Sequence, residues 1–157
     1  MRIGFGYDVH RLVKNRILFL GGVKIEHDKG LLGHSDADVV LHAVIDSVLG
    51  ALAKGDIGTH FPDNDAEFKN INSRLLLQKI TDIMQIEGFK IGNLDVTVCI
   101  EKPKLKEYIP LMRKNLAADL NCDINLISVK ATTEEGLGVS GKSAGISAYA
   151  VVLLKSL

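Results

Sequence analysis

The sequence predicts an α+β fold in which helices cover one face of a mixed β-sheet. Residues 91–101 alternate apolar and polar side chains, as a half-buried strand does, and residues 36–53 carry apolar side chains at helical spacing. Helices and strands also follow one another without strict alternation. The 157 residues fit one domain, 1–157, without an internal repeat or a long linker.

The N-terminal part is expected to form a strand and a small β-hairpin. Residues 2–12 read as a strand whose apolar row is Ile3, Phe5, Tyr7 and Val9. On the strand period, Asp8 and His10 share the opposite face. Residues 17–25 predict two short strands around Gly21-Gly22, a hairpin turn signal.

The rest of the chain mixes helices and strands. Helix 36–53 is expected to start at Ser35 or Asp36 and to end by Gly55. The further elements are a polar loop at 55–70, helices at 73–87 and 108–120, strands at 91–101, 127–132 and 146–154, and a glycine-rich stretch at 133–145. Strand 146–154 is apolar on both faces, so we expect helices on one side and another subunit on the other.

Charge and cysteine usage exclude several classes of function. Lys plus Arg equals Asp plus Glu at 19 each, so no bulk charge attracts nucleic acid or an anionic membrane. No uncharged stretch reaches transmembrane length, and the start shows no signal-peptide pattern. Cys99 and Cys122 lie far apart without a C-x-x-C motif, which suits a reducing cytoplasm.

A metal site is one interpretation of three dispersed polar residues. Asp8 and His10 share a strand face, and His42 lies within an apolar helix between Asp38 and Asp46. Two histidines and a carboxylate are a common ligand set for zinc, and an aspartate such as Asp46 could orient the second nitrogen of His42. The alternatives are a polar strand face and a core histidine held by an aspartate.

Polar loops supply further candidates, each of which could also be an ordinary turn. His34 and Ser35 precede a helix N-terminus, which favours phosphate. Carboxylates in 55–70 could recognise hydroxyls, and the glycines in 130–142 allow an anion nest. Lysines in 102–106 could contact a phosphate or a nucleotide. Together these residue types suit metal-assisted chemistry on a phosphate or diphosphate.

Six stretches together resemble one enzyme family. They are GYDVHRL, ILFLGGVKI, GLLGHSDADVVLHAVIDSVLGA, GDIGTHFPDND, DVTVCIEKPKL and VKATTEEGLG. Over nearly the whole chain they are similar to the 2-C-methyl-D-erythritol 2,4-cyclodiphosphate synthases. The resemblance implies a phosphorus–oxygen lyase of the non-mevalonate isoprenoid pathway, which cyclises 4-diphosphocytidyl-2-C-methyl-D-erythritol 2-phosphate and releases CMP. It also implies a homotrimer with active sites between subunits.

The resemblance also implies roles for individual residues. Asp8, His10 and His42 would bind zinc, His34 and Thr133 would stabilise the transition state, and Glu135 would meet a second ion, Mg²⁺ or Mn²⁺. The stretches that would hold the methylerythritol phosphate contain Asp8, Val9, His10, His34, Ser35, Asp56, Ile57, Gly58, Phe61, Pro62, Asp63, Asn64 and Asp65. The cytidine pocket would use Ile100, Glu101, Lys102, Pro103, Lys104, Leu105 and Lys106. The diphosphate would contact Thr132, Thr133, Glu134 and Glu135.

The sequence departs from the family pattern near the end of the glycine-rich stretch. Val139 and Lys142 stand where the family carries an aromatic residue and an arginine. That region lines a trimer-axis cavity for an isoprenoid diphosphate in the family, and lysine lacks the bidentate fork of arginine. Two rival functions stay open at this point: a metal-dependent phosphohydrolase and an inert ligand-binding trimer.

Overall fold

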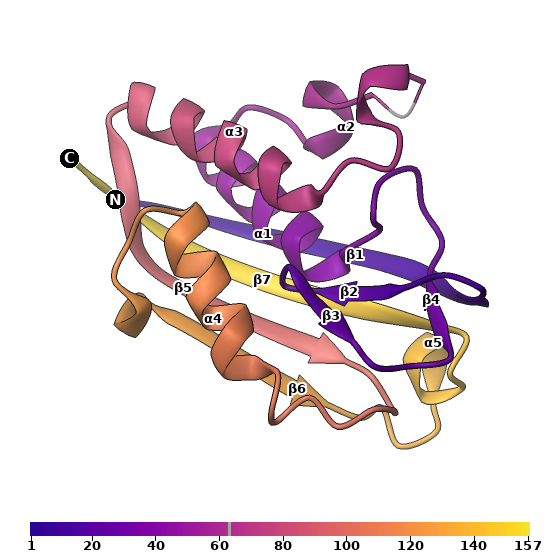
Figure 1. The fold of residues 1–157 in the computed structure, drawn as a ribbon. Helices are drawn as coiled ribbons and strands as arrows, with labels where there is room; N and C mark the ends of the chain where they lie inside the picture. Colours follow the sequence, from indigo (N-terminus) through magenta and orange to yellow (C-terminus); the bar gives the residue numbers. More distant parts are fainter. Residues whose placement is uncertain (63) are drawn as a thin grey trace.

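A five-stranded β-sheet forms one layer of the molecule, and helices cover one of its faces (Figure 1). The structure is a computed structural model and describes residues 1–62 and 64–157. The strand order is β4-β1-β7-β5-β6, in which β5 and β6 are parallel and the other neighbours are antiparallel. This is the mixed sheet with one helical face that the sequence predicts.

The elements follow the predicted order along the chain. The sheet consists of β1 (Arg2–Lys14), β4 (Lys29–Leu31), β5 (Phe89–Cys99), β6 (Ile127–Thr132) and β7 (Gly145–Ser156). The separate hairpin is β2 (Leu18–Leu20) and β3 (Val23–Ile25). The helices are α1 (Val39–Leu52), α2 (Ile57–His60), α3 (Ser73–Ile86), α4 (Ile109–Asp119) and α5 (Gly138–Gly141), with 3-10 turns η1 (Ala66–Phe68) and η2 (Ile124–Leu126). In the described part of the chain, no helix combines the length and apolar character needed to cross a membrane.

Apart from the predicted hairpin, the short elements are the ones that the sequence analysis does not predict. The expected loop 55–70 contains α2 and η1, because the side chains of Asp56 and Asp65 accept backbone hydrogen bonds at their starts. Strand β4 and helix α5 are also new, since three or four residues are too few to show a period. Helix α1 starts at the N-cap Asp38, later than expected, and ends at Ala53 in the left-handed conformation rather than at Gly55.

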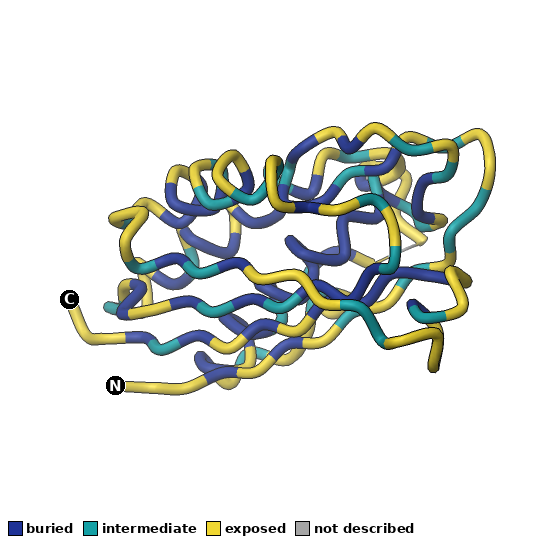
Figure 2. The backbone as a smooth tube through the Cα atoms, turned by 90° about the horizontal axis from the view of Figure 1, so that it is seen from below, coloured by how far each residue is buried: buried dark blue, intermediate teal, exposed yellow. Residues whose placement is uncertain are grey.

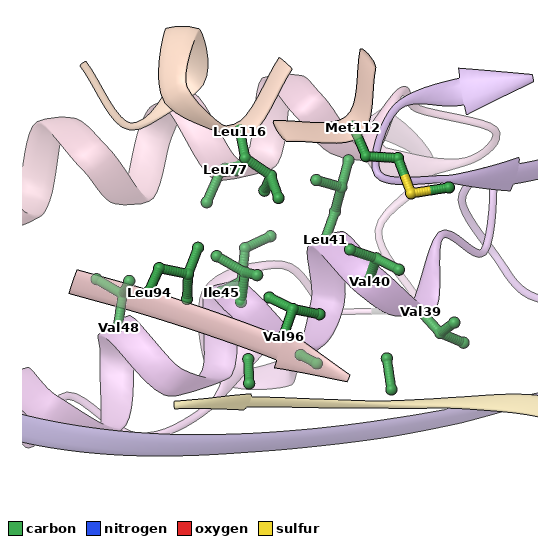
Figure 3. Close-up of a cluster of buried hydrophobic side chains, with 14 of the residues drawn as sticks. Val39, Val40, Leu41, Ile45, Val48, Leu77, Leu94, Val96, Met112 and Leu116 are labelled. Carbon is green, nitrogen blue, oxygen red and sulfur yellow. The ribbon is translucent and has the colours of Figure 1, made fainter. Parts of the chain in front are cut away.

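Helix α1 lies at the centre of the core. It packs between the sheet and the outer helix α3, and nearly all of its side chains are buried. Figure 3 shows its contact layer: the labelled side chains include Leu41, Ile45 and Val48 of α1, Leu94 and Val96 of β5, Leu77 of α3, and Met112 and Leu116 of α4. Burial of one such side chain contributes about 1.5–3 kcal/mol, so this layer fixes α1 against the strands.

The two faces of β1 differ sharply. Gly4 and Gly6 face α1, and a Cβ atom on Gly6 would lie 1.9 Å from the Ala43 carbonyl oxygen. Only glycine allows this close approach. The opposite face of β1 and β7 is exposed, as the yellow segments of the strands in Figure 2 indicate. Its exposed apolar residues, here called the outer row, are Ile3, Phe5, Tyr7, Val9, Tyr149 and Val151.

Candidate active site

Asp8, His10 and His42 form a cluster with the geometry of a metal site. The Asp8 Oδ2 atom lies 3.0 Å from His10 Nε2 and 2.9 Å from His42 Nδ1. The two histidine nitrogens are 3.3 Å apart. One carboxylate and two imidazoles with converging donor atoms suit Zn²⁺ or a related divalent ion. Three protein ligands leave a coordination position for another molecule.

Close packing of β1 on α1 brings the three ligands together. Asp8 and His10 lie on the face of β1 that turns toward α1, as the strand period predicts. His42 lies one turn into α1, whose start is held by Asp38. This fully buried carboxylate accepts hydrogen bonds from the N–H groups of Gly21 and Gly22 and from the first turn of the helix. Burial and the nearby charge of Asp36 raise the pKa of Asp38, while these N–H groups lower it.

A backbone carbonyl fixes the orientation of His10. The Leu32 oxygen lies 2.7 Å from His10 Nδ1 and can only accept, so Nδ1 carries the proton. Nε2 of the neutral ring then presents its lone pair to Asp8 and His42. This is the common arrangement for a metal-binding histidine, whose second nitrogen donates to a carbonyl or carboxylate.

Asp8 stays ionised within this cluster. Burial raises the pKa of Asp8, but the adjacent His10 and His42 rings outweigh this effect, and the net pKa lies below the ordinary aspartate value. The carboxylate is therefore charged at neutral pH, as a ligand for a divalent cation must be.

The second nitrogen of His42 has partners other than the predicted aspartates. Nε2 lies 3.0 Å from Ser73 Oγ and 3.2 Å from Ser35 Oγ. The expected partner Asp46 instead accepts a hydrogen bond from the Ile57 N–H at 2.8 Å. Asp46 thus holds the start of α2. Ser73 was predicted only as a helix cap, because its distance in sequence from His42 hides the contact.

A cavity of about 260 Å³ opens beside the metal cluster. It is lined by Asp8, His10, Gly33, His34, Ser35, His42, Ile57, Gly58, Phe61, Phe68, Ile71 and Leu76. Many of the residues predicted to hold the methylerythritol phosphate therefore meet here. The apolar wall of Phe68, Ile71 and Leu76 was not predicted, since apolar residues of a helix or turn carry no sign of lining a cavity.

A second cavity, of about 290 Å³, contains most of the predicted cytidine pocket. Its lining residues are Ile100, Pro103, Lys104, Leu105, Ala131, Thr132 and Thr133. It shares no lining residue with the first cavity, so within the described chain Thr133 does not line the cavity beside the metal cluster. Glu101 and Lys102 line a smaller hollow next to it.

Several predicted residues take part in loop contacts. Thr133 Oγ1 donates to Glu135 Oε1 at 2.6 Å, and Glu134 Oε2 accepts from the Ser140 N–H and hydroxyl. The Asp56 carboxylate accepts from the N–H and hydroxyl of Thr59.

The remaining predicted residues lie apart from the metal cluster or at its margin. Val9 belongs to the outer row, Val139 and Lys142 are exposed at α5, and Pro62, Asn64 and Asp65 precede η1. The His34 ring donates from Nε2 to the Asp65 carbonyl oxygen across 3.2 Å. The prediction for Asp63 falls outside the described residues.

Comparison with known proteins agrees with the resemblance. A model described as the YgbB family matches residues 1–155. A protein of Clostridium botulinum (strain Hall) named 2-C-methyl-D-erythritol 2,4-cyclodiphosphate synthase is 60% identical over 154 residues, which are 98% of this chain and 99% of that protein. A protein of the same name from Bacteroides thetaiotaomicron is 55% identical over 155 residues, which are 99% of this chain and 98% of that protein.

Solved structures show the same fold. A Plasmodium falciparum structure described as an IspF CDP complex is 39% identical, with a TM-score of 0.86, and the match covers 99% of this chain and 96% of that one. The bifunctional IspDF from Campylobacter jejuni is 43% identical with a TM-score of 0.95; the match covers 99% of this chain and 42% of that longer one. This chain therefore belongs to the YgbB family, whose relatives compared here are 2-C-methyl-D-erythritol 2,4-cyclodiphosphate synthases.

Proposed function

We propose that this chain is a CMP-forming phosphorus–oxygen lyase of the non-mevalonate route to isoprenoid precursors. It converts 4-diphosphocytidyl-2-C-methyl-D-erythritol 2-phosphate to 2-C-methyl-D-erythritol 2,4-cyclodiphosphate. An oxygen of the 2-phosphate attacks the β-phosphorus, and the bond from that phosphorus to the CMP oxygen breaks. One molecule supplies both nucleophile and leaving group, so no water is consumed.

The observation that carries this proposal is the Asp8–His10–His42 cluster at the edge of a cavity, in a chain of this family. We propose that the cluster holds Zn²⁺, which would act as a Lewis acid on a diphosphate oxygen and offset charge repulsion. A second ion, Mg²⁺ or Mn²⁺, would reach the diphosphate near Glu135. A cytoplasmic location also stays a prediction.

The side chains around the cavity would fold the substrate into its reactive shape. His34 and Ser35 would bind the phosphate at one end, and the apolar wall with Phe61 would exclude water that competes with ring closure. Well-oriented intramolecular reactions reach effective molarities on the order of 10⁵–10⁸ M. Positioning by these residues therefore supplies much of the rate enhancement.

We further propose that the active enzyme is a homotrimer in which the two cavities of neighbouring subunits form one site. The separation of the metal cavity from the cavity of Thr133 supports this, because the diphosphate must reach both. The outer row supports it as well. It places Phe5 at 61% and Val151 at 47% exposure on one face of the sheet, an apolar surface suited to burial between subunits.

A product assay tests the proposal against hydrolysis. Incubation with the cytidyl substrate, with and without a chelator, is followed by phosphorus NMR and by chromatography of nucleotides. We expect CMP and a cyclic diphosphate in equal amounts, both lost on chelation and restored by added divalent ions. CMP accompanied only by ring-opened product would identify a phosphohydrolase, and a nucleotide that binds without turnover would identify an inert binding protein.

A further inference from the structure

We propose that Asp36 and Ser73 are positioning residues that keep a proton on His42 Nε2, so that Nδ1 offers its lone pair to the metal. This inference rests on the metal-binding part of the proposed function. Neither residue lines the cavity beside the metal cluster, and the side chain of Ser73 is fully buried. Both therefore act through His42 rather than on a substrate.

The Asp36 carboxylate determines which groups in this hydrogen-bond network donate and which accept. Its Oδ1 atom lies 2.5 Å from Ser73 Oγ, and its Oδ2 atom accepts from the Ser73 N–H at 3.0 Å. An ionised carboxylate can only accept, so the single hydroxyl proton of Ser73 points to Asp36. The same residue thus receives two hydrogen bonds from Ser73, which fixes both the hydroxyl and the start of α3.

The orientation of the Ser73 hydroxyl in turn determines which nitrogen of His42 carries the proton. Ser73 Oγ, whose proton is already used, can only accept from His42 Nε2 at 3.0 Å. Nε2 must therefore carry a hydrogen, and the lone pair of the neutral ring lies on Nδ1, which faces Asp8 Oδ2 at 2.9 Å.

Among the hydroxyl groups of the described residues, Ser35 is the other one that contacts His42 Nε2, and its proton could reverse this assignment. Its Oγ accepts from the Ala37 N–H at 3.1 Å and lies 3.4 Å from Ser73 Oγ and 3.2 Å from His42 Nε2. If the Ser35 hydroxyl donates to Ser73 Oγ, each donor in this network faces an acceptor. A Ser35 proton directed to Nε2 would instead place the ring proton on Nδ1, where it opposes metal binding.

Nitrogen NMR of the imidazole rings tests the assignment without any turnover. Long-range proton–nitrogen spectra of the full metal-free chain would be recorded for wild type and Ser73→Ala, with His42→Ala to assign the signals. We expect a protonated Nε2 on His42 in the wild type and a mixture of tautomers in Ser73→Ala. An unprotonated Nε2 in the wild type would overturn the proposal.

Zinc affinity, measured by competition with a chromophoric chelator, tests the consequence. We expect Ser73→Ala to bind zinc roughly 10–100-fold more weakly, as for loss of other groups that orient metal ligands. Asp36→Asn should weaken binding in the same direction, because an amide can accept only one of the two hydrogen bonds from Ser73. The matched control is Ser47→Ala, a fully buried serine of α1 whose hydroxyl donates to the Val44 carbonyl oxygen.

The outcomes separate this inference from the proposed function. Wild-type zinc affinity in Ser73→Ala, with Ser47→Ala also unchanged, would refute the positioning role and leave the metal site intact. A wild-type chain that bound no zinc would refute the proposed metal site, while the tautomer spectrum would still decide the hydrogen-bond direction. Recovery of cyclase rate by Ser73→Ala at saturating zinc would show that the serine acts on metal affinity rather than on the substrate.

Discussion

The two faces of β1 come from alternate residues of one strand, yet they are completed in different ways. The inner face carries Gly4, Gly6, Asp8 and His10, and α1 supplies both its packing surface and the third ligand. The outer row has no such cover within the described chain and leaves Phe5 largely exposed. Folding of one chain therefore builds the metal cluster, whereas the outer row requires the proposed assembly.

The largest expected effect comes from a substitution that disrupts the packing of the inner face of β1 on α1. In Gly6→Ala the added Cβ would lie 1.9 Å from the Ala43 carbonyl oxygen and 2.7 Å from the Ser47 nitrogen, and both are backbone atoms of α1. Overpacking typically costs about 1–3 kcal/mol, and we expect the free energy of unfolding to fall by about 3 kcal/mol or more. Urea unfolding at fixed protein concentration measures it.

A glycine on the helix side of the same interface is the control. At Gly50 the nearest atom to an added Cβ is the Phe5 carbonyl oxygen at 3.8 Å, an ordinary contact. Gly50→Ala should therefore stabilise the chain, by up to about 1 kcal/mol from helix propensity. Equal unfolding midpoints for Gly6→Ala and wild type would contradict the close approach of β1 and α1.

An intermediate effect is expected from a substitution in the outer row, which should disrupt the assembly but leave each subunit folded. Val151→Lys places an ammonium group in the proposed subunit interface, where an unpaired charge is strongly unfavourable. We expect sedimentation to show monomers in place of trimers, with loss of cyclase activity and an unchanged far-ultraviolet circular dichroism spectrum. Ile86→Lys, at an apolar position 83% exposed on α3, should leave the trimer intact. Trimers of normal activity in Val151→Lys would place the interface elsewhere.

The smallest expected effect concerns the thiol of Cys122, just after the end of α4. It tests burial on the helical face of the sheet. Burial, with a smaller contribution from Asp123, raises the pKa of Cys122 to about 11 from 9.0. Its thiolate fraction near pH 8 should be about 100-fold lower than in the unfolded chain, and alkylation correspondingly slower, as peptide mass spectrometry can measure. The neutral thiol favours folding below pH 9, and this contribution falls as the pH rises toward 11. Equal alkylation rates in folded and unfolded chains would contradict the burial.

The regular elements and the cluster of candidate metal ligands were accessible from the sequence. Strand period alone placed Asp8 and His10 on one face, and an imidazole inside an apolar helix identified His42. Helix α3 and strand β5 followed from apolar periods long enough to recognise. The resemblance to the cyclodiphosphate synthases was also carried by sequence alone, and the family comparison confirms it.

What the sequence did not reveal depends on contacts between distant segments. Nothing at Ser73 indicates a histidine partner, because an N-terminal helix serine is usually explained by capping. Asp46 follows His42 by one helical turn and seemed a natural partner, yet the turn at Ile57 takes its hydrogen bond. The partition of the candidate residues between two cavities likewise follows only from the folded chain.

The absence of side chains at Gly4 and Gly6 has a consequence for which cation the proposed metal site would select. The separation of β1 from α1 sets how far His42 lies from Asp8, and two missing methyl groups set that separation. The packing of the sheet on the helix thus determines the spacing of the ligands. Flexible loops, which could adapt to a larger ion, do not determine it. Redesign of the site for a cation of another radius would have to begin at positions that never touch the metal.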